Sequence, residues 1–268
     1  MARPKLIVRD LSKVFTIDEG FGKFSSITAI DNVGLEVNEG ELVTLIGPSG
    51  CGKSTLLMIL AGLYDKTSGE VVLDGTPING PGLDRGVVFQ EFALFPWLTV
   101  RNNICFGLKN KGIPAGEHDR IVRHYLKMVK LEEFEKIYPH RLSGGMKQRV
   151  GIARALAYSP ELLLMDEPFG ALDAQTRTSL QQMLVDIWAQ TKKTILFVTH
   201  SVREAVFLSD RIVVLSRRPS KVRAIIEVKL PRPRSRLSEP FLRYEEELEE
   251  LIARELAEEG AERGAHAP

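Results

Sequence analysis

Short, nearly continuous apolar runs recur along the chain and predict buried strands. ELVTLIG (41–47) is the first of them. Four later runs are similar in length and composition: 86–89, 161–166, 194–199 and 211–216. Several are separated by segments in which apolar residues follow helical spacing, such as 175–191. Continuous apolar runs are typical of strands covered on both faces, so we predict an α/β fold with a mainly parallel sheet.

Two segments differ from these runs because they alternate apolar and polar residues around turns. They are KLIVRDLSKVF (5–15) and GEVVLDG (69–75), and they predict a half-exposed, antiparallel N-terminal β-subdomain. Between Gln90 and Tyr158 the strand pattern disappears and helical spacing replaces it. We interpret residues of about 91–158 as a helical subdomain inserted into the sheet.

The composition shifts again from about Pro219. LPRPRSRLSEP (230–240) contains prolines that interrupt regular structure, and FLRYEEELEELIARELAEEG (241–260) follows with apolar residues at helical spacing. This pattern predicts an amphipathic helix with an acidic outer face. The helix either packs on its own domain or docks a partner. We treat residues 226–268 as a short C-terminal extension and expect no separate regulatory domain in it.

Composition and charge narrow the class of protein. The chain has 268 residues, of which 44% are hydrophobic, enough for a substantial core. Its 36 Lys and Arg nearly balance 35 Asp and Glu, so no nucleic-acid partner is expected. No apolar stretch approaches the roughly 20 residues that span a bilayer, and the N-terminal run 6–8 is too short for a secretory signal. We expect a cytoplasmic protein in which Cys51 and Cys105 are free thiols.

The segment GPSGCGKST (47–55) matches the phosphate-binding pattern G-x-x-x-x-G-K-[ST]. Its glycines let successive backbone N–H groups face an anion, Lys53 places a charge between phosphates, and the Ser54 hydroxyl can bind magnesium. A predicted strand precedes the segment and a predicted helix follows it. The candidate nucleotide-binding residues are therefore Gly47, Ser49, Gly50, Cys51, Gly52, Lys53, Ser54 and Thr55.

Polar side chains follow three of the predicted strands. LLLMDE (162–167) ends in two carboxylates. A phosphate-binding hydrolase needs one carboxylate on the metal and one group that orients or deprotonates the water that attacks the phosphate, so we assign Asp166 to Mg²⁺ and Glu167 to this water. Gln90 could bind magnesium or the water, and His200 could hydrogen-bond the γ-phosphate. Ligands of open α/β sheets lie beyond the carboxyl ends of strands, where these residues would project. Each is alternatively an ordinary polar residue at a strand end.

A second glycine pair occurs far downstream, in LSGGMKQ (142–148). Ser143, Gly144 and Gly145 precede a good helix former, so a hydroxyl, two amides and a helix N-terminus could form an anion site. The alternative is a Gly-Gly turn with a serine N-cap.

The order and spacing of these motifs resemble the ATP-binding-cassette (ABC) ATPases over residues 5 to about 225. The resemblance includes ALD (171–173) and implies an ATPase domain at 1–225 that uses ATP and Mg²⁺. It further implies a head-to-tail dimer, in which Ser143, Gly144 and Gly145 meet the nucleotide of a second copy or of a homologous subunit. Asp173 would lie at the subunit contact. Phe15 is the best match for the aromatic that stacks on adenine, and Phe21 and Phe24 remain possible.

Within this family, QEFALFPWLTV (90–100) and the LPRPR tail resemble ATPase subunits of nitrate, sulfonate and taurine importers. Such a subunit lies peripherally at the cytoplasmic face of the membrane, bound to permease subunits. An extracytoplasmic solute-binding protein delivers the solute to these permease subunits. The resemblance places the segment after Gln90 at the membrane subunit, with Phe92, Phe95 and Trp97 as a contact patch or as subdomain core. The competing class is an ABC ATPase of DNA repair or translation, or an importer of an unrelated solute. No long coiled coil or second cassette supports the repair or translation classes.

Overall fold

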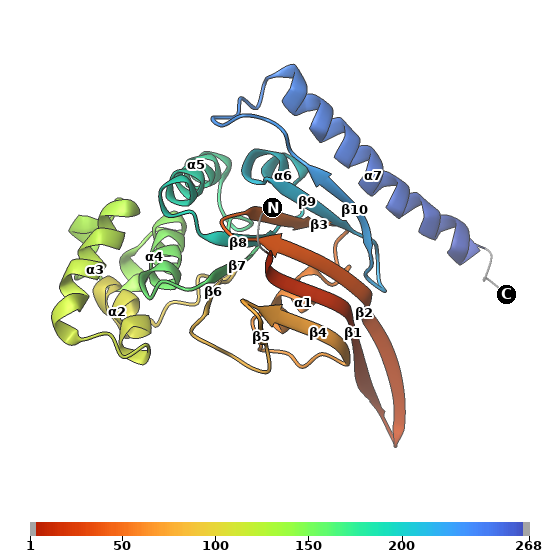
Figure 1. Ribbon diagram of the computed structural model, residues 1–268, viewed down its shortest axis with the longest axis horizontal. Coiled ribbons are helices and arrows are strands. Elements are labelled where there is room, and N and C mark those ends of the chain that lie inside the picture. The colour runs from red at the N-terminus through yellow and green to blue at the C-terminus, as the bar shows by residue number, and fades with distance from the viewer. Residues whose placement is uncertain (1–3, 265–268) are drawn as a thin grey trace. The chain divides into compact units, whose positions relative to one another are not determined.

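A computed structural model describes residues 4–264, with side chains through residue 256. The chain forms two compact units (Figure 1). The first comprises Met1–Gly80 and Leu196–Pro268, and the second comprises Pro81–Ile195.

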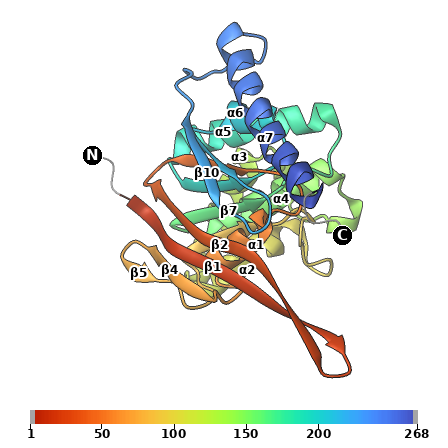
Figure 2. The same cartoon turned by 90° about the vertical axis from the view of Figure 1, so that its right-hand side faces the viewer.

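The first unit contains the antiparallel sheet expected from the alternating segments. Its strands are β1 (Pro4–Gly20), β2 (Lys23–Asn38), β4 (Ser68–Leu73) and β5 (Thr76–Pro77), in the order β2-β1-β4-β5. Val8 of β1 pairs with Leu35 of β2 and with Val71 of β4, and all three are buried. β1 and β2 form a long hairpin that projects beyond the rest of this sheet (Figure 2). No strand was predicted over the residues of β2.

The other strands of the first unit are apolar and mostly parallel. β3 (Leu42–Ile46) and β9 (Arg211–Leu215) pair in parallel, and β8 (Thr194–Val198) contributes its last three residues. The strand order is β10-β9-β3-β8. β10 (Val222–Glu227) pairs antiparallel with β9, and no strand was predicted there. Its residues alternate between half-buried and exposed, as an edge strand should, so its apolar signal is weak.

Two helices of this unit, α6 (Val202–Leu208) and α7 (Glu239–Gly264), pack against each other. α7 is the predicted amphipathic helix, and it buries Phe241 and Leu248 completely. The LPRPR segment before α7 contributes Arg234, whose guanidinium donates to the carbonyls of Val206, Phe207 and Ser209 at 2.7–3.2 Å. These bonds satisfy carbonyl groups that the end of α6 leaves free. Burial, followed by the charge of Arg232, lowers the pKa of Arg234 to about 10.

The second unit contains a short parallel pair and most of the helices. β6 (Arg85–Val88) pairs with β7 (Leu162–Asp166), and the strand order is β8-β7-β6. The helices are α2 (Val100–Asn110), α3 (Ala115–Met128), η1 (Glu132–Phe134), η2 (Pro139–Arg141), α4 (Gly144–Ala157) and α5 (Ala174–Thr191). α4 packs against α2, α3 and α5. The run of helices between β6 and β7 is the pattern expected for the inserted subdomain.

These elements confirm an α/β fold with parallel strands, an antiparallel β-subdomain and inserted helices. Cys51 and Cys105 are both buried and free, as expected. Across the helices that the structure describes, none is both long enough and apolar enough to cross a bilayer.

Candidate functional site

The loop between β3 and α1 (Lys53–Leu60) has the backbone that the phosphate-binding pattern requires. Gly50 and Gly52 have φ angles of +73° and +113°, which side chains other than hydrogen disfavour. Gly52 is the N-cap of α1, whose first free N–H groups follow it. The loop therefore leads into a helix N-terminus whose first N–H groups have no acceptor within the helix, a geometry that suits anionic phosphate oxygens.

Gly47 and Lys53 hold the two ends of this loop together. A Cβ on Gly47 would lie 2.6 Å from the carbonyl oxygen of Leu215 in β9, so only glycine fits. The Lys53 side chain is buried, and its Nζ donates to the carbonyls of Gly47 at 2.9 Å and Pro48 at 3.0 Å. The lysine thus lies inside the loop, where a phosphate oxygen can replace a carbonyl as its acceptor.

Two further side chains complete the surroundings of the loop. Burial raises the pKa of the Cys51 thiol, although nearby Lys53 opposes the shift, so the thiol stays neutral. Arg218 donates to the carbonyl of Gly50 at 3.1 Å. Sequence reasoning missed Arg218. Its position just beyond β9, a strand beside β3, was a signal that could have found it.

His200 follows β8, and its position relative to β3 is fixed by the backbone. The N–H of Thr199 donates to the carbonyl of Leu45, close to the end of β3, at 3.2 Å. Ser201 then caps α6 by accepting a hydrogen bond from the Glu204 amide. His200 and the phosphate loop therefore leave the carboxyl ends of neighbouring strands, and His200 is exposed there.

In the second unit, Gln90 lies just after β6, Asp166 is the last residue of the neighbouring β7, and Glu167 follows it. Val88 of β6 pairs with Met165 of β7, so the two strand ends are level. Asp166 is buried, whereas Glu167 is half-buried and has a φ of +41°. A non-glycine residue with this φ is strained, and such strain often marks a functional position.

Gly170 shows how close Gln90 and Glu167 lie. A Cβ built on Gly170 would stand 3.5 Å from Gln90 Nε2 and 3.8 Å from Glu167 Oε2. The amide and the carboxylate therefore flank one small space beside Gly170. The structure thus brings together two of the predicted catalytic residues.

The segment after Gln90 is held by Arg154 of α4. Its guanidinium donates to the carbonyl of Ala93 at 2.6 Å and lies 5.7 Å from the centre of the Phe95 ring. A groove of about 660 Å³ opens beside this segment. Gln90, Phe92, Pro96, Pro139, His140 and Lys147 are among the residues that line it.

The second glycine pair begins α4. Ser143 is its N-cap, and the hydroxyl accepts a hydrogen bond from the Met146 amide at 3.3 Å. Gly144 and Gly145 are the first residues of the helix. A Cβ on Gly145 would lie 2.5 Å from Cγ2 of Thr176 in α5, so this glycine permits close packing of α4 on α5. The serine cap was anticipated, whereas the packing role of Gly145 was not.

Asp173 caps α5 in the same manner. Its Oδ1 accepts a hydrogen bond from the Thr176 amide at 2.9 Å. This bond holds the pKa of the exposed Asp173 carboxyl below its usual range.

Comparison with known proteins decides the family. A model of the family described as "ABC transporter" matches residues 30–170, which is more than half of the chain. The chain belongs to the ABC transporter family. It is an ATP-binding-cassette ATPase, as the order of its motifs predicted.

Several relatives of this ABC ATPase align over most of its length. An uncharacterized ABC transporter ATP-binding protein from Methanocaldococcus jannaschii is 53% identical, covering 94% of this chain and 92% of that protein. An aliphatic sulfonates import ATP-binding protein from Bacillus cereus is 48% identical, covering 87% and 90%. A nitrate import ATP-binding protein from Synechocystis is 46% identical, covering 92% and 94%.

A solved structure supports the fold and the chemistry of the family. It is a dimeric ATP-binding cassette in a post-hydrolysis state bound to ADP and Pi. The two chains are 34% identical, with a TM-score of 0.72 over 84% of this chain and all of that one.

Of the three aromatics considered for adenine, Phe15 lies nearest the phosphate loop of the ATPase. Phe15 pairs with Ile27, two residues before Ala29, whose carbonyl oxygen would lie 3.1 Å from a Cβ on Gly52. Phe24 is five residues before Ala29, about 17 Å away along an extended strand. Phe21, at the hairpin turn, is fully exposed.

Proposed function

We propose that this ABC ATPase powers import of a small anionic or polar solute, such as nitrate, a sulfonate or taurine, through separate membrane subunits. A solute-binding protein outside the membrane would deliver the solute to these subunits. The observation that carries the proposal is the likeness to nitrate and sulfonate import ATP-binding proteins, which extends over nearly the whole chain.

We propose that the phosphate loop, from Gly47 to Thr55, binds the triphosphate of ATP and that Phe15 stacks on the adenine. The Lys13 ammonium, 4.8 Å from the centre of the Phe15 ring, would add charge near the nucleotide. In this assignment Ser54, Asp166 and Gln90 hold Mg²⁺. Mg²⁺ is a hard cation that takes oxygen ligands, commonly with one carboxylate or two and with phosphate and water in its shell, so this hydroxyl, single carboxylate and amide oxygen suit it. When bound, the ion would neutralise charge on the phosphates.

Glu167 is proposed to orient and deprotonate the attacking water. Its carboxylate lies beside the space that Gln90 also flanks, which supports a shared water position. His200, exposed at the end of β8, would donate a hydrogen bond to the γ-phosphate. Bond cleavage would release phosphate from ADP, and the ADP would remain held by the loop.

Two copies of the chain are proposed to pack head to tail, so that Ser143, Gly144 and Gly145 of one copy contact the ATP of the other. The exposed serine at a helix N-terminus and the dimeric state of the similar cassette support this assembly. Asp173, exposed at the start of α5, would lie at the subunit contact. ATP would then stabilise the closed dimer, and hydrolysis would reopen it.

The groove beside Gln90 is proposed to receive a cytoplasmic segment of the membrane subunit, which places the ATPase peripherally at the membrane. Trp97 is 70% exposed and lies against Phe95, with ring centres 5.6 Å apart. Phe92 and Phe95 are half-buried. This arrangement favours a contact patch for Trp97, while Phe95 also packs on Phe106 within its own unit.

Glu167→Gln tests the proposed function. The variant should bind ATP normally, hydrolyse it at least 100-fold more slowly, and fail to restore growth of a deletion strain on its imported solute. Growth on single nitrogen or sulfur sources identifies that solute. Growth of the deletion strain on nitrate, sulfonates and taurine at the parental rate would contradict the importer assignment.

A further inference from the structure

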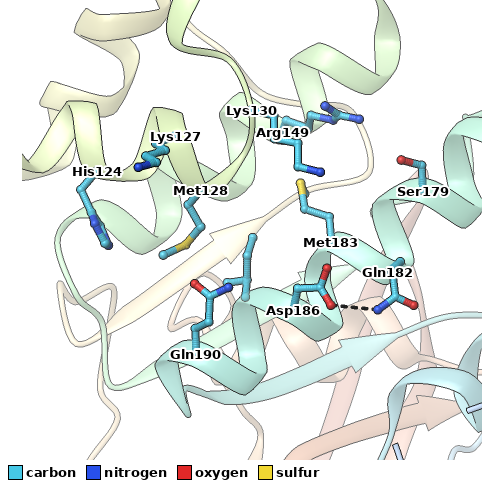
Figure 3. A pocket seen from close by; sticks show the side chains of 11 residues that line it. His124, Lys127, Met128, Lys130, Arg149, Ser179, Gln182, Met183, Asp186 and Gln190 are labelled. Carbon is cyan, nitrogen blue, oxygen red and sulfur yellow. Dashed lines mark hydrogen bonds between the residues drawn. The ribbon is translucent and has the colours of Figure 1, made fainter. Parts of the chain in front are cut away.

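A second groove lies in the second unit, between α3, α4 and α5 (Figure 3). Its volume is about 630 Å³, within the range of small-molecule binding sites. The residues that line it are His124, Lys127, Met128, Lys130, Arg149, Ser179, Gln182, Met183, Asp186, Ile187 and Gln190. None of them lines the groove beside Gln90.

The floor of this groove is apolar and contains two methionines. Met183 and Ile187 of α5 are buried, and Met128 of α3 is half-buried. Methionine side chains adapt their shape to an apolar ligand. The floor can therefore accept an alkyl or aromatic body.

The wall formed by α3, Lys130 and Arg149 is basic. Lys127 and Lys130 are exposed, and neither makes an ion pair among residues 4–256. Arg149 is half-buried, and its guanidinium donates a long bond, of 3.5 Å, to the Val129 carbonyl. His124 lies on the same side (Figure 3). Lys127, Lys130 and Arg149 therefore lie on one wall, and the groove-lining residues of that wall include no acid.

The opposite wall, on α5, carries the single acid of the groove. Asp186 accepts a hydrogen bond from Gln182 at 2.8 Å, one turn before it on the same helix. A negative group entering the groove would be repelled by Asp186 and attracted by Lys127, Lys130 and Arg149. The charge pattern therefore gives an anion one orientation, with its head on the basic wall and its body over the methionines.

We propose that this groove binds a small organic anion, a sulfonate or carboxylate on an apolar body. The proposal is independent of the importer function, because it rests only on residues of α3, α4, α5 and Lys130. Neither a neutral apolar molecule nor a bare inorganic anion would use both the floor and the basic wall.

The probe is hexanesulfonate, added to the full chain labelled with ¹³C at methionine methyl groups. The chain has six methionines, so each methyl signal can be assigned by single Met→Leu substitution. Met128 and Met183 should shift and saturate with a Kd of roughly 1 mM, the affinity expected for about ten heavy atoms. Met58 and Met165, outside the groove, should not shift. 1-Hexanol and sulfate should each bind at least fivefold more weakly.

Lys127→Gln combined with Lys130→Gln should weaken hexanesulfonate binding about tenfold. The matched control is Lys23→Gln with Lys136→Gln, which removes two exposed lysines elsewhere and should leave the Kd unchanged. Unchanged Met58 and Met165 signals verify that each variant is folded. The proposal is overturned if Met128 and Met183 fail to saturate, if 1-hexanol binds equally well, or if both double variants bind alike.

Discussion

This ABC ATPase has two glycine-containing segments, residues 47–55 and 142–148, in which glycine has different structural roles. In the phosphate loop, Gly50 and Gly52 adopt positive φ angles, and Gly47 lies against a backbone carbonyl. In LSGGMKQ (142–148), the signature segment, Gly144 and Gly145 are the first residues of a helix, and Gly145 lies against a threonine side chain. In the first segment glycine supplies both positive φ angles and close approach to backbone, and in the second it supplies small volume beside a side chain. A smaller neighbouring side chain can relieve a clash with that side chain, whereas no side-chain substitution relieves a clash with backbone.

Gly47→Ala should have the largest effect. Its Cβ would meet the Leu215 carbonyl at 2.6 Å, so β9 or the loop must shift. We expect a loss of about 1–3 kcal/mol in the free energy of unfolding and at least tenfold weaker ATP binding. Urea unfolding and titration with a fluorescent ATP analogue measure the two effects. Gly34→Ala in β2 is the control, because its Cβ would lie 3.7 Å from the Val8 carbonyl, an ordinary contact.

Gly145→Ala should destabilise the protein by about 1–2 kcal/mol, and a second substitution should rescue it. Thr176→Ser removes the methyl group that the new Cβ would strike, so the double variant should recover more than half of the loss. Gly116→Ala, in α3 with open space around it, should instead stabilise by about 0.4–1 kcal/mol. Urea unfolding of the wild type, of the two single variants Gly145→Ala and Thr176→Ser and of the double variant gives the coupling free energy between residues 145 and 176. An additive double variant would show that the Thr176 contact is not the reason for Gly145.

The caps of α4 and α5 allow a smaller test. The folded-state pKa of Asp173 is lowered by the hydrogen bond from the Thr176 amide. The contribution of this hydrogen bond to the free energy of unfolding is therefore fully present above about pH 4, the pKa of Asp173 in the unfolded chain. It is lost as the pH falls through the folded-state pKa of Asp173. The Ser143 cap of α4 does not titrate. NMR should show the Thr176 amide moving with a midpoint below pH 4 while the Met146 amide stays constant. Asp173→Asn should abolish the Thr176 titration, and an unchanged curve in that variant would assign it to another group.

The same contrast explains what the sequence could predict. The phosphate loop was recognised because its requirements are local, a fixed spacing of Gly, Lys and Ser after a strand. The contact of Gly47 with Leu215 and that of Gly145 with Thr176 were missed because they join residues far apart in the chain. β10 was missed because an edge strand is only half-buried and lacks an apolar run. Gln90 and Glu167 were predicted from strand ends, and the structure places them around one space.

The central claim is that the signature segment of one copy completes the ATP site of another, and the dependence of ATPase rate on protein concentration tests it most directly. The rate per chain of the isolated protein should rise with concentration over about a thousandfold range and then reach a plateau. Ser143→Arg should remain near zero throughout, although its monomer binds ATP normally. A wild-type rate per chain that stays constant down to concentrations at which light scattering shows only monomer would contradict the account.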